Sequence, residues 1–161
     1  MTRAFWFGLA LVGAVLVQTA LGYLVAGPGR FVDPFLLVVV YAALAGGETQ
    51  GMLAGVAAGW VQDVVFGGRV LGLSALSKLA IGYAAGAAGG RFLITTPGAR
   101  ALSVLAASVA DGILVPWLAS VFQIEVTPMG PLAFVGRACA NALIAGLAFA
   151  AVERRLQRSL S

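Results

Sequence analysis

Residues 59–72 read GWVQDVVFGGRVLG, and this stretch decides how the chain is interpreted. An apolar run carries a carboxylate at Asp63, meets a Gly-Gly pair and then becomes apolar again. Glycine and polar residues mark helix ends and turns, whereas a membrane-spanning helix needs about 20 apolar residues. The stretch therefore predicts the end of one membrane helix, a short turn and the start of the next.

The composition of the whole chain indicates the same class of protein. Of the 161 residues, 61% are hydrophobic and only 10% are charged. Soluble domains are about a quarter charged, so residues 1–161 are predicted to form a single integral membrane domain. No histidine is present, which excludes Ser-His catalysis, and the single cysteine, Cys139, excludes an intramolecular disulfide. No metal or cofactor is expected.

Six apolar segments are long enough, given some tolerance, to cross about 30 Å of hydrocarbon. They predict an all-α bundle of six transmembrane helices. The first segment follows Arg3 as a signal peptide would, but its length favours an uncleaved helix. The second segment is short, so the second and third also allow interpretation as one broken hairpin that lacks a full span. The predicted helices cover about residues 4–26, 33–47, 49–66, 72–90, 100–123 and 131–152.

The arginines predict the orientation, because cytoplasmic loops carry an excess of Lys and Arg. With six crossings both termini lie on one side. That side would hold Arg3, Arg91, Arg100, Arg154, Arg155 and Arg158, and the other side only Arg30 and Arg69. Both termini are therefore predicted to be cytoplasmic, in the inner membrane of a bacterium if the resemblance described below holds.

The net charge of +4 does not indicate nucleic-acid binding, because the basic residues are spread over chain ends and short loops. The basic C-terminal tail is expected to set the topology and to contact anionic lipid. Docking of a cytoplasmic partner is the alternative for this tail.

Charged side chains at membrane depth are costly, face the protein interior and usually have partners. The candidates for buried ion pairs or for an interface are Asp63, Lys78, Asp111, Arg137 and Asn141. Two alternatives stay open for Arg137, a contact with Asp111 or outward extension of its side chain. Pro116 is expected to kink its helix beside Asp111, because proline cannot donate to the carbonyl four residues earlier.

Glycines spaced four residues apart flank the turn and predict close packing of two antiparallel helices. The helix-packing glycines are Gly51, Gly55 and Gly59 before the turn and Gly82, Gly86 and Gly90 after it. Mating the two rows sets Gly59 against Gly82 and Gly51 against Gly90. The same register sets Asp63 against Lys78, so a salt bridge between these two side chains is predicted.

The order of these features resembles a known family. Residues 33–86 read DPFLLVVVYAALAGGETQGMLAGVAAGWVQDVVFGGRVLGLSALSKLAIGYAAG, and residues 137–156 read RACANALIAGLAFAAVERRL. Pro34, the carboxylate at Asp63, the following Leu-Gly and Gly82-Tyr83 are similar in order and spacing to the rod shape-determining protein MreD family. Lys78 departs from this pattern, which has an apolar or small polar residue there.

The resemblance implies a non-enzymatic membrane scaffold of the bacterial cell-elongation machinery. It implies binding to MreC and, through the complex, to the glycosyltransferase RodA, a penicillin-binding transpeptidase and the MreB cytoskeleton, all within membrane lipid. It also implies a fold like that of the substrate-binding components of energy-coupling-factor transporters. The competing hypothesis is therefore such a component of a vitamin or metal-ion importer, with Asp63 and Lys78 as pocket residues.

Two enzyme-like or carrier-like hypotheses are weaker. An intramembrane aspartyl protease would use Asp63 and Asp111, but neither follows the Gly-x-Gly sequence of such enzymes. A proton-coupled carrier would use the same two acids.

Overall fold

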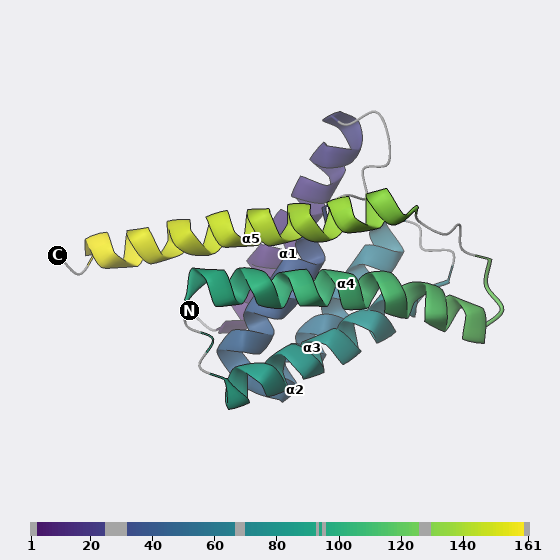
Figure 1. Cartoon of the computed structure of the whole chain (residues 1–161), viewed down its shortest axis with the longest axis horizontal. Helices are drawn as coiled ribbons and strands as arrows, with labels where there is room; N and C mark the ends of the chain where they lie inside the picture. Colours follow the sequence, from purple (N-terminus) through teal and green to yellow (C-terminus); the bar gives the residue numbers. More distant parts are fainter. Residues whose placement is uncertain are drawn as a thin grey trace.

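The computed structural model describes residues 3–24, 32–66, 70–92, 94, 96–125 and 130–159, and the regular structure in these ranges is helical. Figure 1 shows α4 and α5 running side by side, with α3 and α2 on one side of them and α1 behind. The five helices are α1 (Arg3–Leu24), α2 (Pro34–Val65), α3 (Leu73–Arg91), α4 (Pro97–Val121) and α5 (Pro131–Ser159).

The helix α2 is bent back on itself at Gly47. Gly47 has a φ of 80° and a ψ of −168°, a conformation that glycine adopts without steric cost. The rings of Phe35 and Phe66 lie 6.0 Å apart, whereas about 31 residues of straight helix would separate them by about 46 Å. The two parts of α2 therefore form a helical hairpin.

The described residues form five helices where six were predicted, because the predicted second and third segments are the two parts of α2 on either side of Gly47. The predicted boundary between the second and third segments falls inside α2, because Gly47 reverses the chain without an intervening loop. Residues 34–46 are only about 20 Å long, less than the roughly 30 Å of hydrocarbon. The broken-hairpin interpretation thus fits better. Among the described residues, four helices meet the length and apolar composition of a membrane span, namely α1, α2, α4 and α5.

The contact between α2 and α3 rests on glycine, as predicted, but in a different register. A Cβ atom at Gly51 would overlap the carbonyl oxygen of Gly82, and one at Gly55 would overlap the carbonyl of Lys78. Gly51 was expected to face Gly90, so the observed register is shifted by about eight residues, or about 12 Å along α3.

The remaining glycines of the two rows follow the same shift. Gly59 faces Ala75, and Gly86 faces Glu48 beside the bend, so both still pack helix against helix. Gly90 has open space around it and makes no such contact, which corrects its predicted role.

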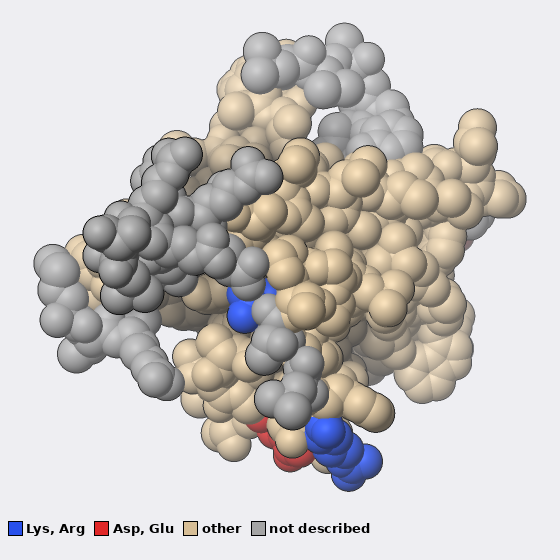
Figure 2. Space-filling model, turned by 60° about the vertical axis from the view of Figure 1, so that its left-hand side comes forward, with Lys and Arg blue, Asp and Glu red and all other residues tan. Residues whose placement is uncertain are grey.

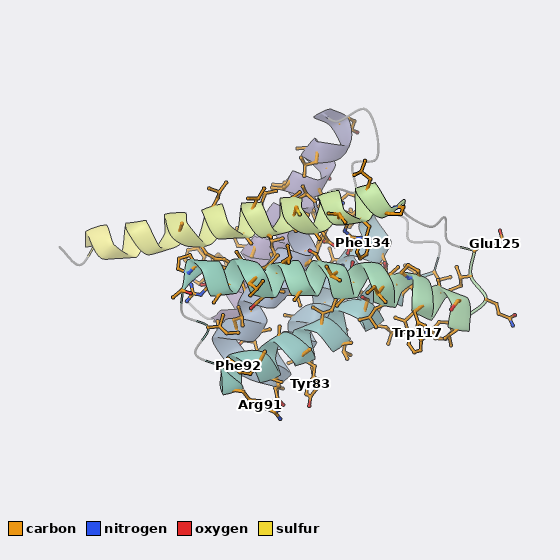
Figure 3. The ribbon with its side chains drawn as sticks, viewed as in Figure 1. Tyr83, Arg91, Phe92, Trp117, Glu125 and Phe134 are labelled. Atoms are coloured by element: carbon orange, nitrogen blue, oxygen red, sulfur yellow. The ribbon has the colours of Figure 1, made fainter. Side chains whose placement is uncertain are left out.

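The bundle has two ends, which Figure 3 marks by labelled side chains. Arg91 and Phe92 lie at one, and Trp117 and Glu125 toward the other. We call these the Arg91 end and the Trp117 end. α4 continues through Pro116 to Val121. The predicted loop residues Arg30 and Arg69 lie outside the described residues, as do the side chains of Arg3, Arg154, Arg155 and Arg158.

The described surface is mostly uncharged. Figure 2 shows one face on which the visible Lys, Arg, Asp and Glu atoms occupy only small spots. Several large apolar side chains are exposed along α1 and α5, among them Leu16, Leu143 and Leu147 at 65%, 68% and 73%. Such a surface is stable only against apolar surroundings.

Candidate functional site

Four charged side chains from different parts of the chain meet inside the bundle. They are Asp33, which precedes α2, Lys78 on α3, Asp111 on α4 and Arg137 on α5. The side chains of Asp33, Lys78 and Asp111 are at most 3% exposed, and that of Arg137 is 16% exposed. We call this group the charge quartet.

Asp33 is held by its position at the start of α2. Its Oδ1 atom accepts a hydrogen bond of 3.1 Å from the backbone N–H of Leu36, and Pro34 occupies the first turn. This is an N-cap followed by proline, an arrangement that starts helices readily. The cap leaves Oδ2 to accept from Lys78 Nζ at 2.9 Å and from Arg137 Nη2 at 3.2 Å.

Asp111 is the second carboxylate of the quartet. Its Oδ1 accepts from the Ser77 hydroxyl at 2.8 Å and lies 3.7 Å from Lys78 Nζ, and its Oδ2 accepts from Arg137 Nη2. Of the two alternatives for Arg137, the contact with Asp111 is the one present.

Asn141 ties the quartet to the backbone. Its Oδ1 accepts from the backbone N–H of Asp33 at 2.8 Å, and its Nδ2 donates to the Ser108 hydroxyl at 2.9 Å. Asn141 is fully buried, so these two hydrogen bonds satisfy an amide that would otherwise be costly to bury.

The quartet is electrically balanced, since two carboxylates face two basic groups. Burying a single charge costs several kcal/mol, whereas paired and hydrogen-bonded charges are tolerated. The Ser77 hydroxyl beside Asp111 is fully buried, so no substrate can reach it in this conformation. Arg137 Nε is buried without a hydrogen-bond partner. The geometry is that of a structural junction between four elements.

Asp63 occupies a different place from the one predicted. Its Oδ2 accepts hydrogen bonds from the backbone N–H groups of Gly72 and Ser74, at 2.9 and 3.1 Å, where α3 begins. The first N–H groups of a helix lack partners within it and carry partial positive charge, so a carboxylate is favoured there. Lys78 lies within 4.0 Å of Asp33 and Asp111, and the predicted pair of Asp63 with Lys78 is absent.

Among the residues predicted as buried polar groups, Lys78, Asp111 and Asn141 are buried and Arg137 is partly buried. The prediction did not join Lys78 to Asp111, and it gave Asp33, at the beginning of a predicted helix, no partner. The Asp-Pro pair was the available signal, because it indicates an N-cap at Asp33. Nothing in the pattern indicated that this helix start lies inside the bundle.

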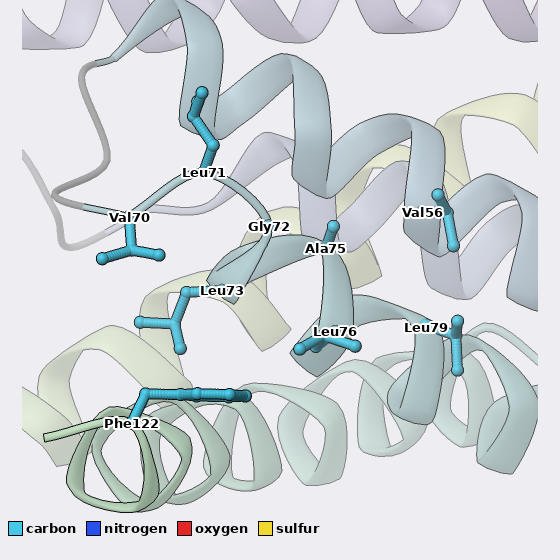
Figure 4. Close-up of a pocket in the computed structure, with 9 residues that line it drawn as sticks. All are labelled: Val56, Val70, Leu71, Gly72, Leu73, Ala75, Leu76, Leu79 and Phe122. Carbon is cyan, nitrogen blue, oxygen red and sulfur yellow. The ribbon is translucent and has the colours of Figure 1, made fainter. Parts of the chain in front are cut away.

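An apolar groove lies between α3 and Phe122, which follows α4, and no member of the quartet lines it. It has a volume of about 330 Å³. Figure 4 shows the ring of Phe122 directed toward Leu73 and Leu76 across this groove. Its lining residues are Val56, Val70, Leu71, Gly72, Leu73, Ala75, Leu76, Leu79 and Phe122, none of them charged. Among the described side chains no three acidic or Cys residues gather as a metal site would require.

Comparison with known proteins agrees with the resemblance seen in the sequence. The family model of the rod shape-determining protein MreD matches residues 3–154, nearly the whole chain. No curated protein and no solved structure matches the chain, so the expected likeness to energy-coupling-factor components has no support from a structural neighbour. The match covers nearly the whole chain, and the structure is a bundle of apolar helices. The chain therefore belongs to the rod shape-determining protein MreD family and is a membrane protein with a role in determining rod shape.

Proposed function

We propose that this protein is a non-enzymatic scaffold subunit of the cell-elongation machinery. It binds MreC, and through the complex it is linked to RodA, a penicillin-binding transpeptidase and MreB. Membership of the family supports the general role in shape determination, and the named partners are those that the family resemblance implies.

The observation that carries the proposal is the closed charge quartet. All four of its members are engaged with one another, and the groups that surround them are buried. Charged side chains used to hold helices together are not presented to a substrate. This use favours a structural role over catalysis or proton transfer.

The apolar exterior supports binding to other membrane proteins. α1 contacts the rest of the described structure only through α2, so most of its surface faces outward. An exposed apolar helix in a bilayer packs equally well against lipid or against a partner's membrane helix. In this proposal the domain is single, the Arg91 end and both termini are cytoplasmic, and the Trp117 end faces outward.

The test is affinity purification of the tagged protein from its native membrane in mild detergent, followed by mass spectrometry. Recovery of MreC with the elongation enzymes is the expected result. Recovery of a pair of ATPases with a coupling membrane protein, or of a bound vitamin, would contradict the proposal and favour the importer component.

Variants separate a folding role from a binding role at Asp63. Asp63→Ala is expected to lower both folded yield and recovery of MreC, because it removes the acceptor at the start of α3. Arg91→Ala, at an exposed position at the other end of α3, is the control and is expected to change neither. Normal yield with loss of MreC alone would instead place Asp63 in the interface.

A further inference from the structure

The described helices form two units with different degrees of contact. The most extensive contacts are those of α2 with α3 and of α4 with α5. We call α1–α3 the first unit and α4–α5 the second unit. Their common boundary, the seam, consists of the smaller contacts of α4 with α3 and α2 and of α5 with α2.

The seam is tied at the Arg91 end. The only covalent connection between the units is the short segment between Arg91 and Pro97. Along the seam, an apolar core joins Leu36, Val40 and Ile81 of the first unit to Val104 and Phe149 of the second. The ring of Tyr41 also stacks on that of Phe149 across the seam, at 5.9 Å.

The seam is incompletely packed at the Trp117 end. The apolar groove lies there, with Phe122 of the second unit on one side and Leu73 and Leu76 of the first unit on the other (Figure 4). Of the residues that line this groove of about 330 Å³, only Phe122 belongs to the second unit, so around the groove the two units meet through a single side chain.

The charge quartet is divided evenly across the seam. Asp33 and Lys78 belong to the first unit and are 2.9 Å apart, and Asp111 and Arg137 form an ion pair within the second. Each unit thus contributes one acidic and one basic side chain to the quartet. Separation of the units breaks two ion contacts across the seam, from Arg137 to Asp33 at 3.2 Å and from Lys78 to Asp111 at 3.7 Å. Each of the four side chains still keeps a partner of opposite charge in its own unit.

We propose that the seam opens at the Trp117 end while the two units hinge about the Arg91 end. Each unit keeps its own ion pair as the seam opens. The closed state is favoured by the cross-seam ion contacts and by two uncharged hydrogen bonds, from Ser77 to Asp111 and from Asp33 N–H to Asn141. This inference concerns the chain itself and does not depend on the proposed partners.

Distances between spin labels test the motion. In a Cys139→Ala background, labels at Val64 and Val121 report on the Trp117 end, and labels at Leu53 and Leu147 report on the part of the seam toward the Arg91 end. All four side chains are exposed. In lipid nanodiscs, the first pair is expected to give two populations of distance and the second pair one narrow population. One narrow population for both pairs would overturn the proposal.

Two matched double variants test the role of the charges. Asp111→Asn/Arg137→Gln leaves Asp33 and Lys78 paired within one unit, and the longer distance is expected to persist. Asp33→Asn/Arg137→Gln leaves only Lys78 and Asp111, which lie in different units, so opening strands both charges. Asparagine also serves as an N-cap, so the start of α2 is retained.

The expected result for the second variant is loss of the longer distance. If the longer distance between the labels at Val64 and Val121 were equally populated in the two double variants, the proposal would be overturned. The variants have the same net charge and differ in which ion pair of the quartet remains. If either variant fails to elute as a folded monodisperse species, the wild-type distances at the two label pairs still decide whether the seam opens.

Discussion

Replacing Lys78 with methionine tests whether the charge quartet holds the fold together. Lys78 Nζ lies 2.9 Å from Asp33 and 3.7 Å from Asp111, and the lysine side chain is 1% exposed. Methionine has a similar length but no charge, so Lys78→Met leaves two carboxylates to share Arg137. Removing one partner of a buried ion pair costs roughly 3–5 kcal/mol, since the remaining charge is uncompensated and solvent does not screen it.

The size of this loss is measured by unfolding in mixed micelles of mild detergent and sodium dodecyl sulfate, followed by circular dichroism. Asp33→Asn/Lys78→Met removes a whole pair and leaves Asp111 and Arg137 together, so it is expected to be less destabilised than Lys78→Met alone. Arg91→Met, at an exposed site, is expected to stay within about 0.5 kcal/mol of the wild type.

Two results would refute this reasoning. A loss below about 1 kcal/mol for Lys78→Met would mean that water or lipid headgroups reach the quartet and screen it. If the stability lost by Asp33→Asn/Lys78→Met equalled the sum of the losses of Asp33→Asn and Lys78→Met, the two side chains would not be energetically coupled.

Three further substitutions, each with a control variant, test the glycine contact of α2 with α3, the cap formed by Asp63 and the bend at Gly47. Gly51→Ala is expected to destabilise the contact of α2 with α3, because its Cβ would overlap the Gly82 carbonyl, whereas Gly90→Ala meets open space and should be neutral or slightly stabilising in thermal unfolding. Asp63→Ala should cost about 1 kcal/mol and speed hydrogen exchange at Gly72 and Ser74, with Asp63→Asn close to the wild type; unchanged exchange would contradict the capping role. Gly47→Ala should cost about 1–2 kcal/mol because of its φ of 80°, and Gly13→Ala, in open space on α1, is the control.

The class of fold was predictable because it depends on composition and local signals. Apolar length predicts membrane helices, and glycine, proline and polar residues predict their ends. The breaks near residues 47 and 66 were therefore found. Whether a break is a loop or a single bent residue was not predictable, because both use glycine. Gly46-Gly47 turned out to reverse the chain within one helical element.

The partners of the buried charges were less predictable, because pairing depends on tertiary register. The prediction from the glycine spacing assumed a tight turn between α2 and α3, and this turn would place Asp63 opposite Lys78. Asp63 instead caps the start of α3, and the helices meet with Gly51 against Gly82. Asp33 was missed because its partners come from α3 and α5, neither of which adjoins it in the chain.

The burial of Asp33, the N-cap of α2, has a consequence for the order in which the chain inserts into the membrane during synthesis. Translation delivers Asp33 to the membrane 45 residues before Lys78 and 104 residues before Arg137. Until those side chains arrive, the short segment 34–46 starts with an uncompensated carboxylate and is too short to span the bilayer alone. The carboxylate of Asp33 therefore gains its first basic partner when α3 is inserted and its second only when α5 follows.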